Sequence, residues 1–409
     1  MSYGIINPNE EQLQAWKLNS WDQLCTGEEG FGQLFSRRER QRLQERAAFS
    51  DQAMAMLASL NDFDRRKVIE EILALIRNPS CGEAKRHWRN PLNRFIKSRY
   101  PFGQYHFLIN YLVEDDYRIL VREIFYDDDL TGMKTPFANE RPMMYNVQRL
   151  SGMKYERPIN VAESGALRLA WEVGDPTSQV TTQHAAVNGM LNDLEKAGWL
   201  MGVHLDNAYR NVNPKEYTLF HNPTEEKWVD LVECLWDKSP LTSHNAKYLS
   251  AVLKQRQQAG QRTEWVVHSQ GAIIFSAAVE HHNRSHRTLL NQHSVAVHAP
   301  GAHLKRMRSA LERAGIAITR VRQNPFDLVP NLAGRNNLRA SSLWRCLSFS
   351  NLVASDNGGN LGVSPHTLPY LGINTYQKQL EIAGFTKEAE AVRCYIEKRN
   401  YERQRRRGR

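Results

Sequence analysis

The strongest structural signal in the sequence is WVVHSQG, residues 265–271. Its apolar run leads directly into Ser269, and a glycine two positions later opens GAIIFSAAVEHHN (271–283), a segment of small and branched residues. The apolar run predicts a buried strand and the following segment a helix. A serine at such a tight turn projects its Oγ above the sheet. The next backbone N–H lies at a helix N-terminus, where the dipole favours developing negative charge. We therefore predict Ser269 as a nucleophile and the N–H of Gln270 as an oxyanion donor.

On both sides of this segment, strand-like and helix-like patterns alternate as a mostly parallel sheet requires. The expected strands are 217–221, 263–269, 293–301 and 316–322, and the expected helices are 225–237, 246–260, 271–283 and 302–315. Together these elements predict an α/β domain over residues 205–400, whose first strand is 217–221. Upstream of it, residues 136–204 are expected to form a loop-rich connector that ends in an amphipathic helix, 184–200.

Two residues downstream of Ser269 are candidates to complete a catalytic triad. Asp327 directly follows the last expected strand, in QNPFDLVP. His366 lies in the loop SPHTLPY, just before the last expected helix, 374–384. Asp356, in SDNGGN, is the rival acid. We favour Asp327 because it follows a strand, whereas Asp356 lies in a glycine-rich turn.

The HSQG run at the serine, the DLVP run at the aspartate and the chain order Ser, Asp, His resemble α/β-hydrolases of the lipase-like branch. The resemblance implies a triad in which His366 accepts the proton of Ser269, while Asp327 orients and steadies the imidazolium. It also implies an acyl-enzyme on the serine. Val267 stands where the family's G-x-S-x-G pattern has its first glycine, so we expect the turn to open slightly around a bulkier side chain.

The second oxyanion donor is expected in the loop after the strand at 217–221, with His221 or Asn222 as the candidate. An Asn-Pro turn without a catalytic part is the alternative. Residues 331–363, which are polar and glycine-rich, are expected to form a cap over the site. His281, His282 and His286 lie along an expected helix and its end, where we expect solvated or packed side chains and not metal ligands. The sequence contains no Cys/His cluster, so we expect no metal and no other cofactor.

The first part of the chain predicts a smaller, different structure. Residues 1–60 are typical of a helical segment, with a basic amphipathic patch at 35–49. Residues 61–135 are typical of an α+β domain in which a helix precedes hairpin strands at 103–113 and 116–126. The helix, the basic connector and the antiparallel strands with a YRILV run resemble the RelE/ParE toxins. That resemblance implies action on messenger RNA at the ribosome, or on gyrase, through basic residues; the candidates are Arg94, Lys97, Arg99 and Arg122. The alternative is that these side chains are simply solvated.

Composition limits what the protein can be. With 409 residues, of which 41% are hydrophobic and 24% charged, the chain is long enough for two or three domains with buried cores. Its five cysteines are scattered and form no CxxC pair, which argues against a disulfide framework and for a reducing compartment. No signal peptide is visible at the start, and no run approaches the roughly 18 apolar residues that span a bilayer. We therefore expect the protein to be cytoplasmic when it is synthesised.

The charge balance bears on the partners. A formal net charge of +10 favours an anionic membrane surface, nucleic acid or an acidic protein. Part of the excess lies in residues 401–409, which are expected to form a solvated basic tail.

The leading functional prediction is a serine hydrolase that cleaves an ester or lipid substrate, as a lipase or phospholipase does. A hydrolase joined to N-terminal domains without a signal peptide is also similar to bacterial toxin effectors exported by a specialised secretion system, whose partners are immunity or delivery proteins. The alternative is a RelE-like toxin that targets RNA or the ribosome, with the hydrolase fold as an accessory. A third class is a binding module that recruits partners through residues 35–49 and the arginine tail, without turnover.

Overall fold

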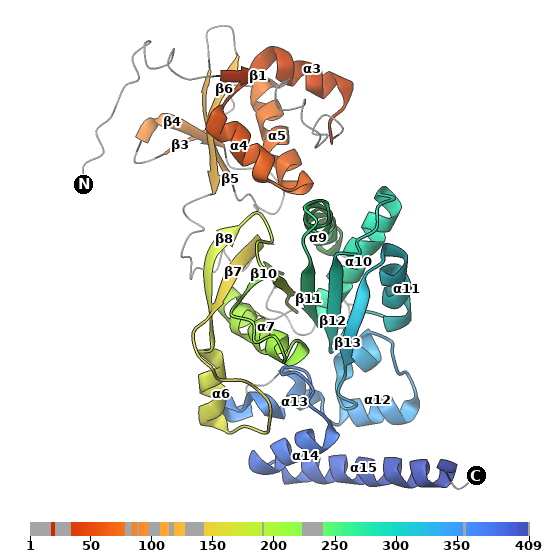
Figure 1. Ribbon diagram of the computed structural model, residues 1–409. Helices are drawn as coiled ribbons and strands as arrows, with labels where there is room; N and C mark the ends of the chain where they lie inside the picture. The colour runs from red at the N-terminus through yellow and green to blue at the C-terminus, as the bar shows by residue number, and fades with distance from the viewer. Residues whose placement is uncertain are drawn as a thin grey trace. The chain divides into compact units, whose positions relative to one another are not determined.

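The computed structural model shows a mixed α/β protein that divides into two compact units, residues 1–133 and 134–409 (Figure 1). The residues that the structure describes are 18–20, 34–77, 84–87, 90–96, 107–113, 118–126, 143–189, 192–222, 240–354 and 357–407. Among them, no helix combines the length and the apolar character needed to cross a membrane.

The first unit is built on a six-stranded sheet with the order β1-β2-β6-β5-β4-β3. Its strands are β1 (Leu18–Ser20), β2 (Ala47–Ser50), β3 (Ala84–His87), β4 (Asn90–Ile96), β5 (Phe107–Val113) and β6 (Ile119–Tyr126). The helices that the structure describes in this unit are α3 (Arg37–Arg46), α4 (Asp51–Ser59) and α5 (Asp62–Arg77). The strands pair antiparallel except for β2 and β6, which are parallel. One apolar core joins the three helices to β2, β5 and β6.

The predicted boundary between residues 1–60 and 61–135 is wrong. The strand β2, from the segment predicted to be helical, pairs with β6, and Phe49 on it lies in the same core as Ile69 and Ile72 of α5. The four residues of β2 are too few for an alternating pattern to stand out between two helical sequences. The predicted helix and hairpin strands are confirmed as α5, β5 and β6. Of the predicted basic candidates, Arg94 lies on β4 and Arg122 on β6, while Lys97 and Arg99 lie outside the described residues.

A buried arginine closes the end of α4. Arg65, on α5, is 5% exposed. Its guanidinium donates to the carbonyl oxygens of Leu57, Ala58 and Leu60 at distances of 2.9, 3.1 and 2.6 Å. The last carbonyls of a helix have no partner within the helix, so a side chain must satisfy them when they are buried. The Arg65 side chain therefore caps α4 from a neighbouring helix.

Replacing Arg65 by methionine should lower the free energy of unfolding of the first unit by about 2–4 kcal/mol, because three carbonyls, two of them on the buried residues Leu57 and Leu60, lose a charged donor. Urea denaturation of the full chain, with hydrogen exchange of the α4 amides, measures the effect. The neighbouring Arg66 pairs with Glu70 at the surface, where its side chain is 51% exposed, and provides the control. Arg66→Met should cost at most about 1 kcal/mol. Equal losses in the two variants would contradict the capping role.

The second unit is built on a seven-stranded, mostly parallel sheet with the order β13-β12-β11-β9-β10-β7-β8. Its strands are β7 (Met143–Arg149), β8 (Trp171–Thr177), β9 (His184–Val187), β10 (Glu216–His221), β11 (Thr263–His268), β12 (His293–His298) and β13 (Ala317–Arg322). The strands from β13 to β10 in this order run parallel, and β7 is antiparallel to both of its neighbours.

Helices cover both faces of this sheet (Figure 1). Val266 on β11 packs into the core formed with α7 (Leu194–Ala208), whereas the adjacent Trp265 packs on Phe275 of α10 (Gln270–Ser285), with ring centroids 5.6 Å apart. Because successive strand residues point to opposite faces, α7 and α10 lie on opposite sides of the sheet. The other helices that the structure describes upstream of Asp327 in this unit are α6 (Val161–Arg168), α9 (Pro240–Gln258) and α11 (Leu304–Ala314).

The prediction that residues 136–204 form a connector is wrong, because this segment supplies β7, β8 and β9, and β9 is central in the sheet. The helix predicted at 184–200 begins only at Leu194, where the Asp193 carboxylate accepts the N–H of Lys196 at 2.6 Å. The predicted boundary at residue 205 falls inside α7. HAAV is short and rich in alanine, so its apolar spacing fits a helix as well as a strand. The helix predicted at 225–237 lies outside the described residues, whereas the other predicted strands and helices of the sheet are confirmed.

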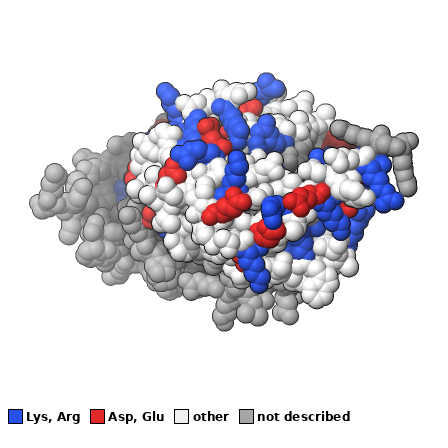
Figure 2. Space-filling view, turned by 90° about the horizontal axis from the view of Figure 1, so that it is seen from below, with Lys and Arg blue, Asp and Glu red and all other residues white. Residues whose placement is uncertain are grey.

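The chain ends in short helices and one long helix: η4 (Val329–Ala333), α12 (Ala340–Leu347), α13 (Ser350–Ala354), η5 (Asn357–Gly359), η6 (Leu361–Val363), α14 (Ile373–Ile382) and α15 (Thr386–Arg407). The predicted tail at 401–409 is thus helical as far as Arg407, because glutamate, glutamine and arginine are good helix formers and the first glycine follows at 408. Residues 401–406 are exposed. Figure 2, which views the molecule from the side of α14 and α15, shows basic side chains interspersed with acidic ones.

Candidate active site

Ser269 lies in a strained turn between β11 and α10. Its φ is 55° and its ψ −124°, a conformation that residues other than glycine rarely adopt. Backbone hydrogen bonds hold it there. The Ser269 N–H donates to the His298 carbonyl at 3.3 Å, and the Ser269 carbonyl accepts from Gly301 at 2.9 Å and from Ala272 at 3.2 Å. The turn predicted from HSQG is therefore present, with Val267 fully buried in the strand before it.

Two glycines allow the backbone to pass close to this turn. A Cβ on Gly271 would overlap the Val187 carbonyl and lie 2.7 Å from the Asn188 carbonyl oxygen. A Cβ on Gly189 would lie 2.6 Å from the Ser269 Cβ and 3.2 Å from its Oγ. The start of α10 thus packs directly on the end of β9, and the loop that follows β9 lies against the serine.

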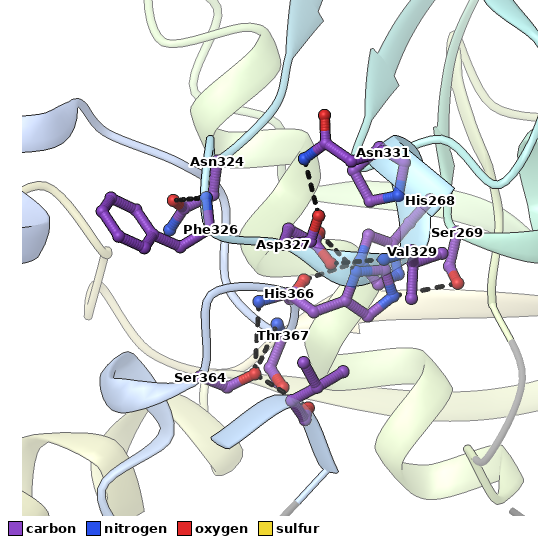
Figure 3. Close-up of polar contacts among 12 residues, drawn as sticks. His268, Ser269, Asn324, Phe326, Asp327, Val329, Asn331, Ser364, His366 and Thr367 are labelled. Carbon is purple, nitrogen blue, oxygen red and sulfur yellow. Dashed lines mark hydrogen bonds and ion pairs between the residues drawn. The ribbon is translucent and has the colours of Figure 1, made fainter. Parts of the chain in front are cut away.

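The structure brings the three predicted triad side chains together (Figure 3). The His366 Nε2 lies 2.9 Å from the Ser269 Oγ, and the His366 Nδ1 lies 2.7 Å from the Asp327 Oδ2. An ionised carboxylate only accepts hydrogen bonds, so Nδ1 carries the proton and Nε2 is free to accept the serine hydroxyl. Asp327 is fully buried and Ser269 is 8% exposed. The geometry is that of a nucleophile, a base and an acid that orients the base.

Asp327 is held from several sides. Its Oδ1 accepts the N–H of Val329 at 3.0 Å, and its carbonyl accepts the Asn331 side chain at 2.7 Å. The Cys346 thiol, on α12, also donates to this carbonyl, at 3.4 Å. Burial raises the pKa of Asp327, while the imidazole of His366 and the N–H of Val329 favour the ionised form and oppose the rise. Asp356, the rival acid, lies outside the described residues.

The predicted second oxyanion donors, His221 and Asn222, are not placed for that role. The N–H of Asn222 donates to the Asn188 side chain at 2.6 Å, so it is already used. His221 is fully buried, burial lowers its pKa to about 3, and neither ring nitrogen has a hydrogen-bond partner among the described residues. The reason is the strand order: β9, not β10, is next to β11, so the loop that reaches Ser269 is the one after β9.

Gln270 keeps its predicted position. Its N–H is the first of α10, directly after Ser269. Its side-chain carbonyl accepts the Asn222 side chain at 2.6 Å, and Asn222 in turn accepts Asn245 at 3.1 Å. The Asn222 side chain therefore supports Gln270, the residue after Ser269.

The loop that begins with Asn188 and Gly189 is not among the predicted site residues. The side chain of Asn188 spans two loops, since it donates to the carbonyls of Gly189 at 2.9 Å and Asn222 at 3.0 Å. An Asn-Gly pair directly after a short run of small apolar residues is a turn signal, and it was available in the sequence. This loop is the source we now expect for the second oxyanion donor.

The chain was compared with protein families, curated proteins and solved structures. No family model, no curated protein and no solved structure matches the chain.

Proposed function

We propose that the second unit is a serine hydrolase of the α/β-hydrolase type that cleaves carboxylic esters through an acyl-enzyme on Ser269. The observation that carries this proposal is the unbroken chain of hydrogen bonds from Asp327 through His366 to Ser269, at 2.7 and 2.9 Å. The nucleophile also stands in a strained strand-to-helix turn, as in the nucleophile elbow of that fold.

The reaction follows from these positions. The Ser269 Oγ attacks the ester carbonyl while its proton passes to the His366 Nε2, and Asp327 stabilises the imidazolium that forms. The N–H of Gln270 and a donor from the loop after β9 stabilise the negative charge on the carbonyl oxygen. The imidazolium then gives its proton to the leaving alcohol as the C–O bond breaks. Water, deprotonated by the imidazole, attacks the acyl-serine, and the acid is released with the Ser269 hydroxyl restored.

A lipid is the substrate class that the surroundings favour. Trp344 is 75% exposed and Leu347 is 48% exposed, three residues apart on one face of α12, whose N-cap residue, Arg339, is also exposed. The opposite face of α12 carries Cys346, which holds the carbonyl of Asp327. Exposed tryptophan and leucine with nearby arginine suit a lipid surface with anionic headgroups. We therefore propose a lipase- or phospholipase-like activity, with α12 in the segment between acid and base that was predicted as a cap.

The direct test is covalent labelling. Wild-type protein should react with a fluorophosphonate probe, with loss of fluoride and formation of a phosphorus–oxygen bond on Ser269, and should hydrolyse a short-chain nitrophenyl ester. Ser269→Ala should do neither, whereas Ser276→Ala, at a serine further along α10, should behave as wild type. Mass spectrometry of the labelled peptide and ester turnover give the two readouts. A folded wild-type protein that never reacts with the probe would end the proposal.

The lipid assignment has its own test. Vesicles of phosphatidylglycerol should be hydrolysed faster than vesicles of phosphatidylcholine, and Ser269→Ala should release no fatty acid from either. Turnover of nitrophenyl esters without any release of fatty acid would retain the hydrolase and reject the lipid. The proposal includes a role as a toxin effector that is delivered by a specialised secretion system and neutralised by an immunity protein.

The second candidate is the RelE-like activity of the first unit on RNA or the ribosome. It is supported by the helix and antiparallel hairpin of α5, β5 and β6, with Arg122 on the sheet. Translation arrest by full-length Ser269→Ala protein would favour it, whereas loss of toxicity in that variant would favour the hydrolase.

A further inference from the structure

Four imidazoles form a column that runs from the predicted base into the interior of the second unit. The ring centroids of His366 and His268 are 4.7 Å apart, those of His268 and His204 are 4.4 Å apart, and those of His204 and His298 are 5.1 Å apart. The rings come from the loop after η6, from β11, from α7 and from β12. His204, His268 and His298 are at most 2% exposed, and the triad described above uses none of them.

The first two interior histidines bind the loop that carries the base. The His268 Nε2 lies 3.0 Å from the carbonyl oxygen of His366, and the His204 Nε2 lies 3.0 Å from the carbonyl oxygen of Thr367. A carbonyl can only accept, so both Nε2 atoms carry a proton and donate. The tautomer of each interior ring is therefore fixed by the backbone of the base loop.

The amides of the same two residues are also held by a side chain. The Ser364 Oγ accepts the N–H groups of His366 and Thr367, each at 3.2 Å, and donates to the carbonyl of Val353 at 2.9 Å (Figure 3). All four backbone polar groups of residues 366 and 367 are thus bonded to side chains, although the loop belongs to no helix or strand ladder. In this loop the side chains of Ser364, His268 and His204 satisfy the backbone groups that would otherwise be bonded within a helix or a sheet.

The third interior ring completes the arrangement. The Nδ1 atoms of His204 and His298 are 2.8 Å apart. Because the proton of neutral His204 is on Nε2, its Nδ1 accepts, and His298 must donate. Burial lowers the pKa of His204 and His268 well below the usual value and that of His298 to about 3, so all three rings are neutral. Four of their six ring nitrogens take part in these hydrogen bonds, whereas His268 Nδ1 and His298 Nε2 have no partner among the described residues. Within the described residues no group of His, Cys, Asp or Glu could hold a metal ion.

We propose that His268 and His204 are positioning residues for the catalytic base, which fix the distance from the His366 Nε2 to the Ser269 Oγ through the backbone of residues 366 and 367. This inference rests on the proposed hydrolase function. His268 precedes Ser269 in the sequence, and its side chain is hydrogen-bonded to the backbone of His366. It therefore links the residue that gives up the proton to the loop that carries the residue that accepts it. A displacement of the base by about 1 Å is enough to lower a rate on the order of 100-fold.

The test compares a variant that keeps the donor with one that removes it. The glutamine Nε2 can replace the imidazole Nε2 as a donor, whereas leucine fills space without a donor. His268→Leu should lower kcat for a nitrophenyl ester by about 10- to 100-fold with less than about a twofold change in KM, and His268→Gln should recover most of the loss. The pair His204→Leu and His204→Gln should show the same order with a smaller range. Hydrogen exchange at residues 364–370 should rise in the leucine variants only.

His282 supplies the matched control. It is fully buried on α10, and its Nε2 lies 2.8 Å from the carbonyl oxygen of Thr288, at the end of the helix remote from Ser269. His282→Leu should lower thermal stability with kcat unchanged. If His268→Leu lowers kcat no more than His282→Leu, or if glutamine gives no recovery, the positioning role is wrong. If wild type shows no turnover that depends on Ser269, the proposed function itself fails, and the exchange rates of residues 364–370 still decide whether the two histidines hold the loop.

Discussion

Replacing His366 by alanine should lower kcat for ester hydrolysis by about 10⁴- to 10⁶-fold, because Ser269 loses the nitrogen 2.9 Å away that takes its proton. The KM should change little, since the imidazole acts on the nucleophile and not on the bound ester. Adding Ser269→Ala should lower kcat less than about tenfold further, because members of a triad act as one unit. Steady-state kinetics of the two single variants and the double variant measure this non-additivity.

The control for this series is His281→Ala, a partly buried histidine on α10 outside the triad. It should keep kcat within about twofold of wild type, since surface substitutions rarely reach the site. Losses that multiply in the double variant would show that His366 and Ser269 act independently, and the acyl-enzyme mechanism would then be wrong.

The second large effect is expected at Gly271. An added methyl group would overlap the Val187 carbonyl, and backbone cannot move aside as a flexible side chain can. Gly271→Ala should therefore push α10 away from β9 and lower the free energy of unfolding of the second unit by about 2–4 kcal/mol. The same shift moves Ser269, so fluorophosphonate labelling should slow as well. Urea denaturation and the labelling rate measure the two effects.

Gly165 provides the opposite case. It is exposed on α6, and an added Cβ there would meet nothing within 4 Å. Gly165→Ala should raise stability by about 0.5–1 kcal/mol, because alanine loses less backbone entropy on entering a helix. If Gly271→Ala and Gly165→Ala change the free energy of unfolding by the same amount, close packing of α10 on β9 is not the reason for glycine at position 271.

The triad could be predicted because each of its members carries a local signal. Ser269 lies directly between the strand β11 and the helix α10, and Asp327 lies in the loop after the strand β13, so both places are marked by the sequence around them. His366 was chosen by chain order among 14 histidines, and the structure places it within hydrogen-bond distance of both partners. Their catalytic role stays a prediction until the labelling experiment is done.

The oxyanion loop could not be predicted in the same way, because it depends on which strands are neighbours. Strand β9 has four residues and lies between β11 and β10 only through pairing with residues some 30 and 80 positions away. Sequence patterns report the period of a segment and carry no information on its partner in a sheet. For the same reason β2 was not predicted: its sequence neighbours have a helical pattern, and its pairing with β6 is not visible in the sequence. His204 was missed for a third reason: α7 and the base loop meet only in the folded chain.

The order in which the chain is made determines when the proposed site is complete. Domains begin to fold while synthesis proceeds from the N-terminus. Ser269 and its turn leave the ribosome almost 100 residues before His366 does, and the two are 97 positions apart. A nascent or prematurely terminated chain that stops short of the His366 loop holds Ser269 without its proposed base. Under the proposed function, a cell that makes the protein is exposed to hydrolytic activity only after the chain has been translated past His366.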